Sequence, residues 1–183
     1  MARRREFDMT EALDAAVEVF WRLGPEGTSV RALCDAMGIQ PGSFYAAFGD
    51  KDACFRRAVG RYIETRPRPT RRGPAAIAEW LDAVVDIEGR PPGCLLVVAA
   101  VERAHLDPLG QATVTAALQA VEDFFWRCLE QRPRAREDAA LLAATVAGLH
   151  VMARSGAPQK RLRLVADHAL ASVGIVDRPV KKS

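Results

Sequence analysis

The segment MGIQPGSFYAAFGDK, Met37 to Lys51, constrains the fold more than any other part of the sequence. Pro41 is suited to the first position of a helix, where its missing N–H would have no partner. Gly49 is suited to the position just past a helix end. Because these two marks leave room for only about two helical turns, we expect a very short helix with both ends fixed.

An amphipathic helix is expected before this segment. Its apolar positions are Leu13, Ala16, Val17 and Phe20. Their spacings of three and four are typical of a helix with one side in a core. Asp8 or Thr10 is suited to cap its start, and Gly24 followed by Pro25 marks its end.

A second helix is expected after Thr28 or Ser29, either of which can cap it, and Gly38 provides a left-handed residue at its end. After the short helix, Asp50 is suited to cap a fourth one. The apolar positions are Val30, Leu33, Cys34 and Met37 in the second helix and Phe55, Val59, Tyr62 and Ile63 in the fourth. Short helices joined by tight glycine turns suggest a helix-turn-helix at about residues 29–48, in which one helix braces and the next enters the major groove of DNA.

The segment RPRPTRRGP, residues 66–74, is rich in proline and arginine and is unsuited to a helix. We place a domain boundary there, with an N-terminal domain at residues 6–66 and a C-terminal domain at residues 75–176. Helices are expected in the second domain at residues 75–87, 94–104, 108–131, 135–154 and 158–173. Since no strand pattern of any length occurs, the fold class is all-α, and the tail DRPVKKS is expected to be loose.

Net charge and composition exclude few classes of function or partner. The net charge is +3, with 27% charged and 49% hydrophobic residues, which is ordinary for a globular protein. Two blocks of arginine stand out: one is Arg3, Arg4 and Arg5, and the other is Arg66, Arg68, Arg71 and Arg72. Either block can contact an acidic polymer, and either can equally be a solvated tail or linker.

The sequence gives no sign of a membrane segment or of catalysis. The four cysteines form no CxxC pair, no signal-peptide pattern is present, and no apolar run approaches the ~20 residues of a transmembrane helix. No histidine lies in HExxH or beside GxSxG, and no glycine-rich phosphate loop occurs. We therefore expect a reduced, cytoplasmic protein with no membrane contact, no catalytic or metal site and no cofactor.

The sequence ALDAAVEVFWRLGPEGTSVRALCDAMGIQPGSFYAAFGDKDACF, Ala12 to Phe55, resembles the DNA-binding domain of the TetR (tetracycline-repressor-like) transcriptional regulators. The resemblance covers about the first third of the chain. It combines an apolar first helix, GTS at the start of the second, MGIQPGSFYAAF as turn and recognition helix, and a lysine that begins the fourth. It implies a dimer that binds a double-stranded DNA operator.

The resemblance also implies site residues. The family positions that contact phosphate are occupied here by Thr28, Arg31 and Lys51, and the position that contacts the sugar–phosphate backbone is occupied by Tyr45. The recognition helix of the family starts at the positions of Gln40, Pro41, Gly42 and Ser43. The core positions of that helix are occupied by Phe44 and Phe48. Many relatives have histidine where this chain has Ala47, so the base-reading groups are few: Gln40, Ser43 and the methyl groups of Ala46 and Ala47.

Three of the assignments in the DNA-binding domain have an alternative. Phe44 and Phe48 are either core residues, which their helical spacing favours, or DNA contacts. Arg3, Arg4 and Arg5 either reach the adjacent minor groove as a basic arm or form a disordered tail. Arg31 either contacts phosphate or is an ordinary solvated arginine.

For the C-terminal domain, the resemblance implies a ligand pocket and a dimer interface. The last two helices, Asp138 to Val173, are expected to pair with their copies in a four-helix bundle, or else their apolar stripe packs inside one chain. The stripe consists of Leu142, Val146, Leu149 and Met152. Pocket candidates are Trp80, Val84, Cys94, Val98, Phe124, Phe125 and His150, and they favour an apolar or aromatic effector unless they are plain core.

Cys94 receives a separate hypothesis. The segment PPGCLLVVAAVE resembles the start of the sixth helix in one TetR subgroup, and a thiolate is favoured near a helix N-terminus. Cys94 is thus expected either to line the effector pocket or sense electrophiles, or to be a small buried residue. The function implied by the whole sequence is a repressor that an effector releases from its operator.

Overall fold

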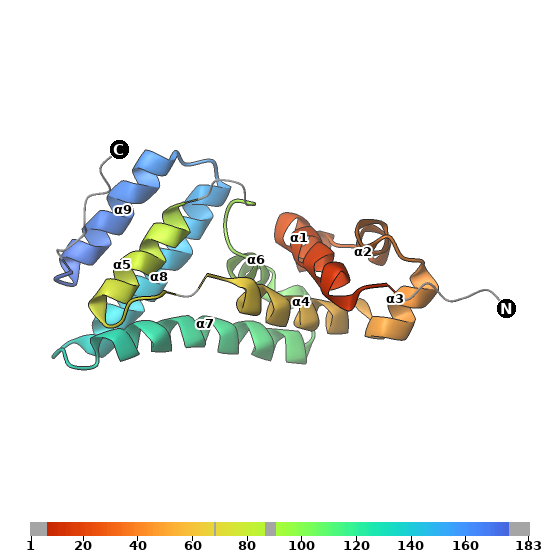
Figure 1. The fold of residues 1–183 in the computed structure, drawn as a ribbon, viewed down its shortest axis with the longest axis horizontal. Helices are drawn as coiled ribbons and strands as arrows, with labels where there is room; N and C mark the ends of the chain where they lie inside the picture. Colours follow the sequence, from red (N-terminus) through yellow and green to blue (C-terminus); the bar gives the residue numbers. More distant parts are fainter. Residues whose placement is uncertain (1–6, 68, 87–90, 176–183) are drawn as a thin grey trace. The chain divides into compact units, whose positions relative to one another are not determined.

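The structure, a computed structural model, describes residues 7–67, 69–86 and 91–175 of the 183-residue chain. The regular elements in this part of the chain are all helices, with no strand, so the all-α prediction is confirmed (Figure 1). The elements are α1 (Met9–Gly27), α2 (Val30–Met37), α3 (Pro41–Phe48), α4 (Lys51–Thr65), α5 (Pro74–Val85), α6 (Leu95–Val101), the 3-10 helix η1 (Arg103–His105), α7 (Pro108–Leu129), α8 (Ala135–Arg154) and α9 (Gln159–Ser172).

The chain divides into two compact units. The N-terminal unit holds the chain up to Arg66 together with Val98–Ala117, and the C-terminal unit holds Pro67–Val97 together with the chain from Leu118 onward. The division after Arg66 falls in the basic, proline-rich segment. The inclusion of Val98–Ala117 in the N-terminal unit was not expected, and it means that α6 and α7 each begin in one unit and end in the other.

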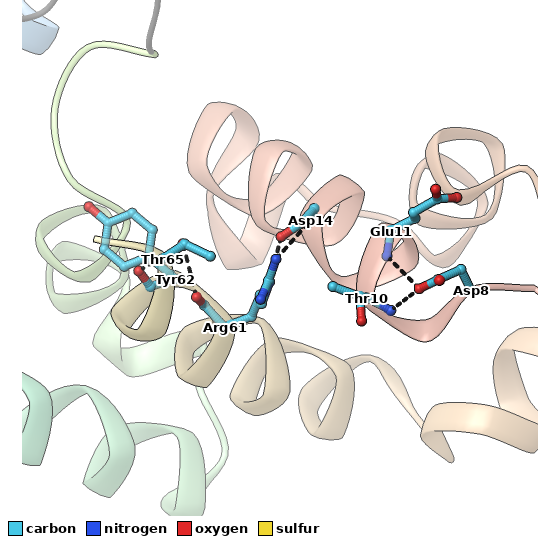
Figure 2. Close-up of polar contacts among 7 residues, drawn as sticks. All are labelled: Asp8, Thr10, Glu11, Asp14, Arg61, Tyr62 and Thr65. Atoms are coloured by element: carbon cyan, nitrogen blue, oxygen red, sulfur yellow. Dashed lines mark hydrogen bonds and ion pairs between the residues drawn. The ribbon is translucent and has the colours of Figure 1, made fainter. Parts of the chain in front are cut away.

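The helix ends in the N-terminal unit follow local sequence signals. The Asp8 carboxylate caps α1 by accepting hydrogen bonds from the backbone N–H groups of Thr10 at 2.7 Å and Glu11 at 3.1 Å (Figure 2). Gly24, with φ 79° and ψ 162°, ends the regular part of α1. One further helical turn, begun by Pro25, follows it, which the sequence pattern did not predict.

The short helix α3 runs from Pro41 to Phe48, as predicted, with Gly49 just past its end. Gly38, which closes α2, adopts the left-handed conformation (φ 66°, ψ 30°) that few other residues accept. The expected caps are also present: Ser29 accepts from the N–H of Ala32 at 3.1 Å, and Asp50 accepts from the N–H of Ala53 at 2.7 Å. Local chemistry therefore fixes the length of α3.

Aromatic side chains fill the core of the N-terminal unit. The rings of Phe20 on α1 and Phe55 on α4 meet edge to face with centroids 5.2 Å apart, and Phe44 on α3 is fully buried. The apolar face predicted for α4 is right except at Ile63, whose side chain is 41% exposed. Ile63 directly follows the buried Tyr62 and so turns away from the core.

An ion pair joins α1 to α4 on the outer side of this core. Arg61 donates from Nε to Oδ1 of Asp14 at 2.6 Å and from Nη2 to Oδ2 at 2.9 Å (Figure 2). The hydrogen bond from Arg61 lowers the pKa of Asp14 below its ordinary value of 3.8. The hydroxyl of Thr65 donates to the Arg61 carbonyl at 3.0 Å one turn further along α4.

In the C-terminal unit, α5, α8 and α9 pack side by side (Figure 1). Fully buried leucines at the centre of this packing are Leu81, Leu142, Leu149 and Leu162. The helix predicted at residues 94–104 is shorter than expected, because α6 ends at Val101 and η1 follows. Ile87 and the tail DRPVKKS lie outside the described residues. Within the described ranges, no helix combines the length and apolar character needed to cross a bilayer.

Candidate nucleic-acid interface

Helix α3 has a buried face and an open face. Phe44 is fully buried and Phe48 is 6% exposed, in agreement with their expected core positions. Tyr45, between them, is 53% exposed. The remaining residues assigned to base or backbone contact are exposed at Gln40, Pro41, Gly42 and Ala46 and half-buried at Ser43 and Ala47. The face that turns away from the core is therefore the face expected to meet DNA.

The N-cap residue of α3 does not use its side chain to cap the helix. Gln40 stands at the N-cap, and its carbonyl accepts the backbone N–H groups of Ser43 at 2.9 Å and Phe44 at 3.1 Å. Its side chain makes no capping hydrogen bond. Since the amide of Gln40 is exposed and is not used in capping, it can donate and accept at a base edge.

Arg31 is the most open of the expected phosphate contacts. Its side chain is 91% exposed, and Asp35, one turn later on α2, is 3.9 Å away. An exposed pair at this distance contributes little to stability. The guanidinium is thus available for a phosphate.

Thr28 does not lie as expected for a phosphate contact. It is 2% exposed, and its hydroxyl donates to the carbonyl of Gly24 at 2.6 Å. Lys51 donates from Nζ to the carbonyl of Pro25 at 2.8 Å. Both side chains hold the connection between α1 and α2, which we call the α1–α2 junction (Gly24–Thr28). The hydroxyl of Thr28 is thus bonded within its own chain and does not face outward.

A segment far along the chain also holds the α1–α2 junction. The carboxylate of Glu102, just after α6, accepts the backbone N–H of Glu26 at 2.9 Å, and Nε2 of His105 lies 3.3 Å from the Glu26 carboxylate. Asp107 forms an ion pair with Arg56 on α4 at 2.5 Å. Sequence reasoning missed these residues, because no local pattern marks a carboxylate that serves a backbone group 76 residues away.

Of the other expected DNA contacts, Arg3, Arg4 and Arg5 lie outside the described residues. In the second arginine block, Arg66 stacks over the rings of Trp21 and Tyr62, with its guanidinium carbon 5.2 and 4.5 Å from their centroids.

No disulfide joins any of the four cysteines. Burial raises the pKa of Cys54 to about 12 and also raises the pKa values of Cys34 and Cys128, which makes these three thiols poor nucleophiles at neutral pH. Cys94 is 7% exposed. Nowhere in the described ranges do three or more His, Cys, Asp or Glu side chains gather as a metal site.

The aromatic residues expected around an effector contact one another in the C-terminal unit. Trp80 lies 4.8 Å from Phe124 and 5.6 Å from Phe125 between ring centroids. Phe125 is fully buried, whereas Trp80, Phe124 and Val84 are half-buried. His150 and Cys94 are buried in the same unit, and Val98 belongs to the N-terminal unit.

The apolar stripe assigned to the dimer interface faces inward. Leu142, Val146 and Leu149 are 0%, 6% and 1% exposed and pack in the core of their own chain, and Met152 is half-buried. The buried side chains of Leu142, Val146 and Leu149 have little surface left for a partner, whereas Met152 keeps part of its surface. The outward stripe of α8 is Leu141, Ala144, Gly148 and Val151, all exposed.

Comparison with known proteins supports the picture of a DNA-binding unit. Residues 12–58 match the family model of bacterial regulatory proteins, tetR family. An uncharacterized HTH-type transcriptional regulator, YezE of Bacillus subtilis, is 31% identical over 139 residues, covering 70% of this chain and 72% of that protein. The HTH-type transcriptional repressor BdcR of Escherichia coli is 29% identical over 169 residues, covering 84% and 83% of the two chains.

Among solved structures, a cysteine mutant of the TetR family transcriptional regulator CifR, complexed with 26-base-pair double-strand operator DNA, has a TM-score of 0.82 and 32% identity. The match covers 93% of this chain and 99% of that one. The reduced form of Escherichia coli NemR, with a TM-score of 0.74 and 18% identity over 88% and 95% of the two chains, shares the fold.

Proposed function

This chain belongs to the tetR family of bacterial regulatory proteins, and from that premise we propose that it is a repressor that binds a palindromic operator as a dimer and is released by a small effector. The observation that carries the proposal is the open face of α3, an eight-residue helix whose buried side chains are Phe44 and Phe48. Solved relatives include CifR on operator DNA. The family consists of transcriptional regulators, so no catalytic activity is assigned.

In the proposed complex, α3 lies in the major groove. The amide of Gln40 and the hydroxyl of Ser43 are the polar groups placed to meet base edges, and the methyl groups of Ala46 and Ala47 meet thymine. The exposed ring of Tyr45 packs on the sugar–phosphate backbone. With so few polar readers, DNA shape and deformability supply a large share of the specificity.

Phosphate contacts position the helix. Arg31 carries an exposed guanidinium at the start of α2, and Lys51 lies at the first position of α4. An ammonium has three protons, so the bond from Lys51 to the Pro25 carbonyl leaves two for a phosphate oxygen. Both contacts are independent of base sequence and weaken as salt rises.

Dimerisation uses the outward side of α8 and α9. On α8, the exposed stripe has the small residues Ala144 and Gly148 at its centre, and a Cβ added at Gly148 would meet nothing within 4 Å. On α9, Leu164 is 69% exposed. Small central residues let two helices approach closely, and a two-fold axis between copies matches a palindromic operator.

Release by an effector requires that a change in the C-terminal unit reach the DNA-binding helices. The half-buried aromatics Trp80 and Phe124 are the proposed contacts for an apolar or aromatic ligand. Alkylation of the native protein tests whether Cys94 takes part, as a pocket residue or as a sensor of electrophiles. Because α6 and α7 run through both units, their rearrangement displaces Glu102 and Asp107, which hold the α1–α2 junction and α4. The favoured state then has its two α3 helices wrongly spaced for the operator.

A gel-shift titration tests the proposal. The probe is the duplex upstream of the protein's own gene, with an unrelated duplex of equal length and base composition as control. We expect a shift specific to the first duplex that weakens as salt is raised. Absence of any shift at low salt would instead favour a partner-binding module that has lost DNA contact, the function class that Ala47 in place of histidine suggests.

A further inference from the structure

The recognition helix α3 is too short to be stable alone and is anchored by few buried side chains. It is eight residues long, and its buried side chains are Phe44 and Phe48. An isolated helix of this length is unstable in water, so its orientation depends on tertiary contacts. At its far end, Gly49 closes the helix with one hydrogen bond from its N–H to the carbonyl of Tyr45 at 2.9 Å.

One side chain from α4 reaches this far end. Arg57 donates from Nη1 to the carbonyl of Ala47 at 3.1 Å, and its guanidinium carbon lies 4.9 Å from the centroid of the Phe48 ring. The same guanidinium thus binds the backbone of the last turn of α3 and stacks on one of the two aromatics that anchor it. Positive charge is favourable there, because carbonyl groups give a helix C-terminus a partial negative charge.

We propose that Arg57 is a positioning residue for operator binding: it ties the last turn of α3 to α4 and so fixes the angle at which α3 meets the groove. This inference rests on the proposed function of α3. Arg57 is exposed, so its replacement does not open a cavity in the core. The alternative for an exposed arginine in a DNA-binding unit is a direct phosphate contact, and the two roles have different signatures.

The first test needs no DNA. Hydrogen exchange of α3 amides is compared among the wild-type protein, Arg57→Ala and Arg57→Lys. We expect Arg57→Ala to speed exchange in α3 about five- to tenfold, the size expected when one cation–π contact and one hydrogen bond from a charged donor are lost at a solvent-exposed site, where water replaces part of each. Arg57→Lys keeps the charge but lacks the planar fork that stacks and donates together, so it restores only part of the protection. Unchanged exchange in α3 of Arg57→Ala overturns the proposal.

The second test measures affinity for the upstream duplex at several salt concentrations, with Arg31→Ala as the control. A positioning role predicts that Arg57→Ala weakens binding about five- to tenfold at every salt concentration, with an unchanged slope of log K against log salt. Loss of a phosphate contact makes that negative slope shallower by about 0.9, as expected for Arg31→Ala. An equally shallower slope in Arg57→Ala identifies a phosphate contact and refutes positioning.

The exchange measurement and the affinity measurement together distinguish a failure of this inference from a failure of the proposed function. If the wild-type protein binds no duplex, the proposed function fails, and the exchange measurement alone decides whether Arg57 holds α3. If the wild-type protein binds and α3 exchange rises in Arg57→Ala without any loss of affinity, Arg57 has no part in operator binding and the proposal is refuted.

Discussion

Replacement of Gly24 by alanine tests how the α1–α2 junction is built. At φ 79° and ψ 162°, Gly24 occupies a region that is essentially restricted to glycine, and a side chain there costs on the order of 1–3 kcal/mol. An added Cβ would also lie 2.1 Å from Oε1 and 2.6 Å from Oε2 of Glu102. The carboxylate must therefore move away and lose its hydrogen bond with Glu26, which adds about 1 kcal/mol at this partly exposed site.

Gly24→Ala is thus expected to lower the free energy of unfolding by roughly 2–4 kcal/mol, measured by urea denaturation followed by circular dichroism. The matched control is Gly60→Ala. Gly60 lies within α4, and a Cβ added there would meet nothing within 4 Å. Alanine at a helix interior position is favoured over glycine by roughly 0.5–1 kcal/mol, so the same substitution stabilises at one site and destabilises at the other.

A double-mutant cycle separates strain from the lost contact. Glu102→Ala alone is expected to cost about 1 kcal/mol, and in that background Gly24→Ala should cost only the backbone strain. The double variant is therefore less destabilised than the sum of the single variants by about 1 kcal/mol. Strict additivity would show that Glu102 does not restrain the junction. A Gly24→Ala cost below about 0.5 kcal/mol would show that the backbone at Gly24 is not strained by a side chain.

Three further outcomes are expected. Tyr45→Ala weakens operator binding about tenfold while leaving thermal stability and the dimer intact, since the ring is 53% exposed; loss of the dimer would mean that its role is misassigned. Leu164→Glu, which places a charge on an exposed apolar position of α9, shifts the protein from dimer to monomer in light scattering after size exclusion, and an unchanged mass would exclude this face. Asp14→Asn removes the ion pair with Arg61. In the wild-type protein this pair lowers the pKa of Asp14. The pair therefore stabilises the fold at pH values above the ordinary pKa of Asp14, and this stabilisation is lost as the pH falls through the lowered pKa. At pH 7 the melting temperature of Asp14→Asn is expected to be slightly below that of the wild-type protein, and this difference should disappear in acid. A difference that persists at low pH would contradict this expectation.

The positions of the helices in the N-terminal unit could be predicted from the sequence because their signals are local. Gly38, Pro41 and Gly49 act on the backbone of their own turn, and each mark lies at the helix end that the structure has. The open face of α3 followed in the same way, since Phe44 and Phe48 share one side of the helix. The contact of α3 with Arg57, on another helix, could not be predicted in this way, because it joins residues that are not neighbours in one helix.

The failures have three physical causes. On α8, apolar and small residues lie on both sides of the helix, so the stripe that includes Leu142 and the one that includes Leu141 have similar periodicity; burial alone distinguishes them. At the α1–α2 junction, the restraint by Glu102 is a contact between residues 76 positions apart, which no spacing rule predicts. Thr28 illustrates a third ambiguity, because the hydroxyl that suits a phosphate is equally suited to a backbone carbonyl.

The proposal that two copies of this chain place their α3 helices on one operator can be tested by titrating the purified protein into the fluorescently labelled upstream duplex. Stoichiometry and salt dependence are measured together. We predict a specific complex of two chains per palindromic site, weakened by added salt with a slope that reports several phosphate contacts. Binding of equal strength to unrelated DNA, or no binding at low salt, would show that the chain is not an operator-specific regulator.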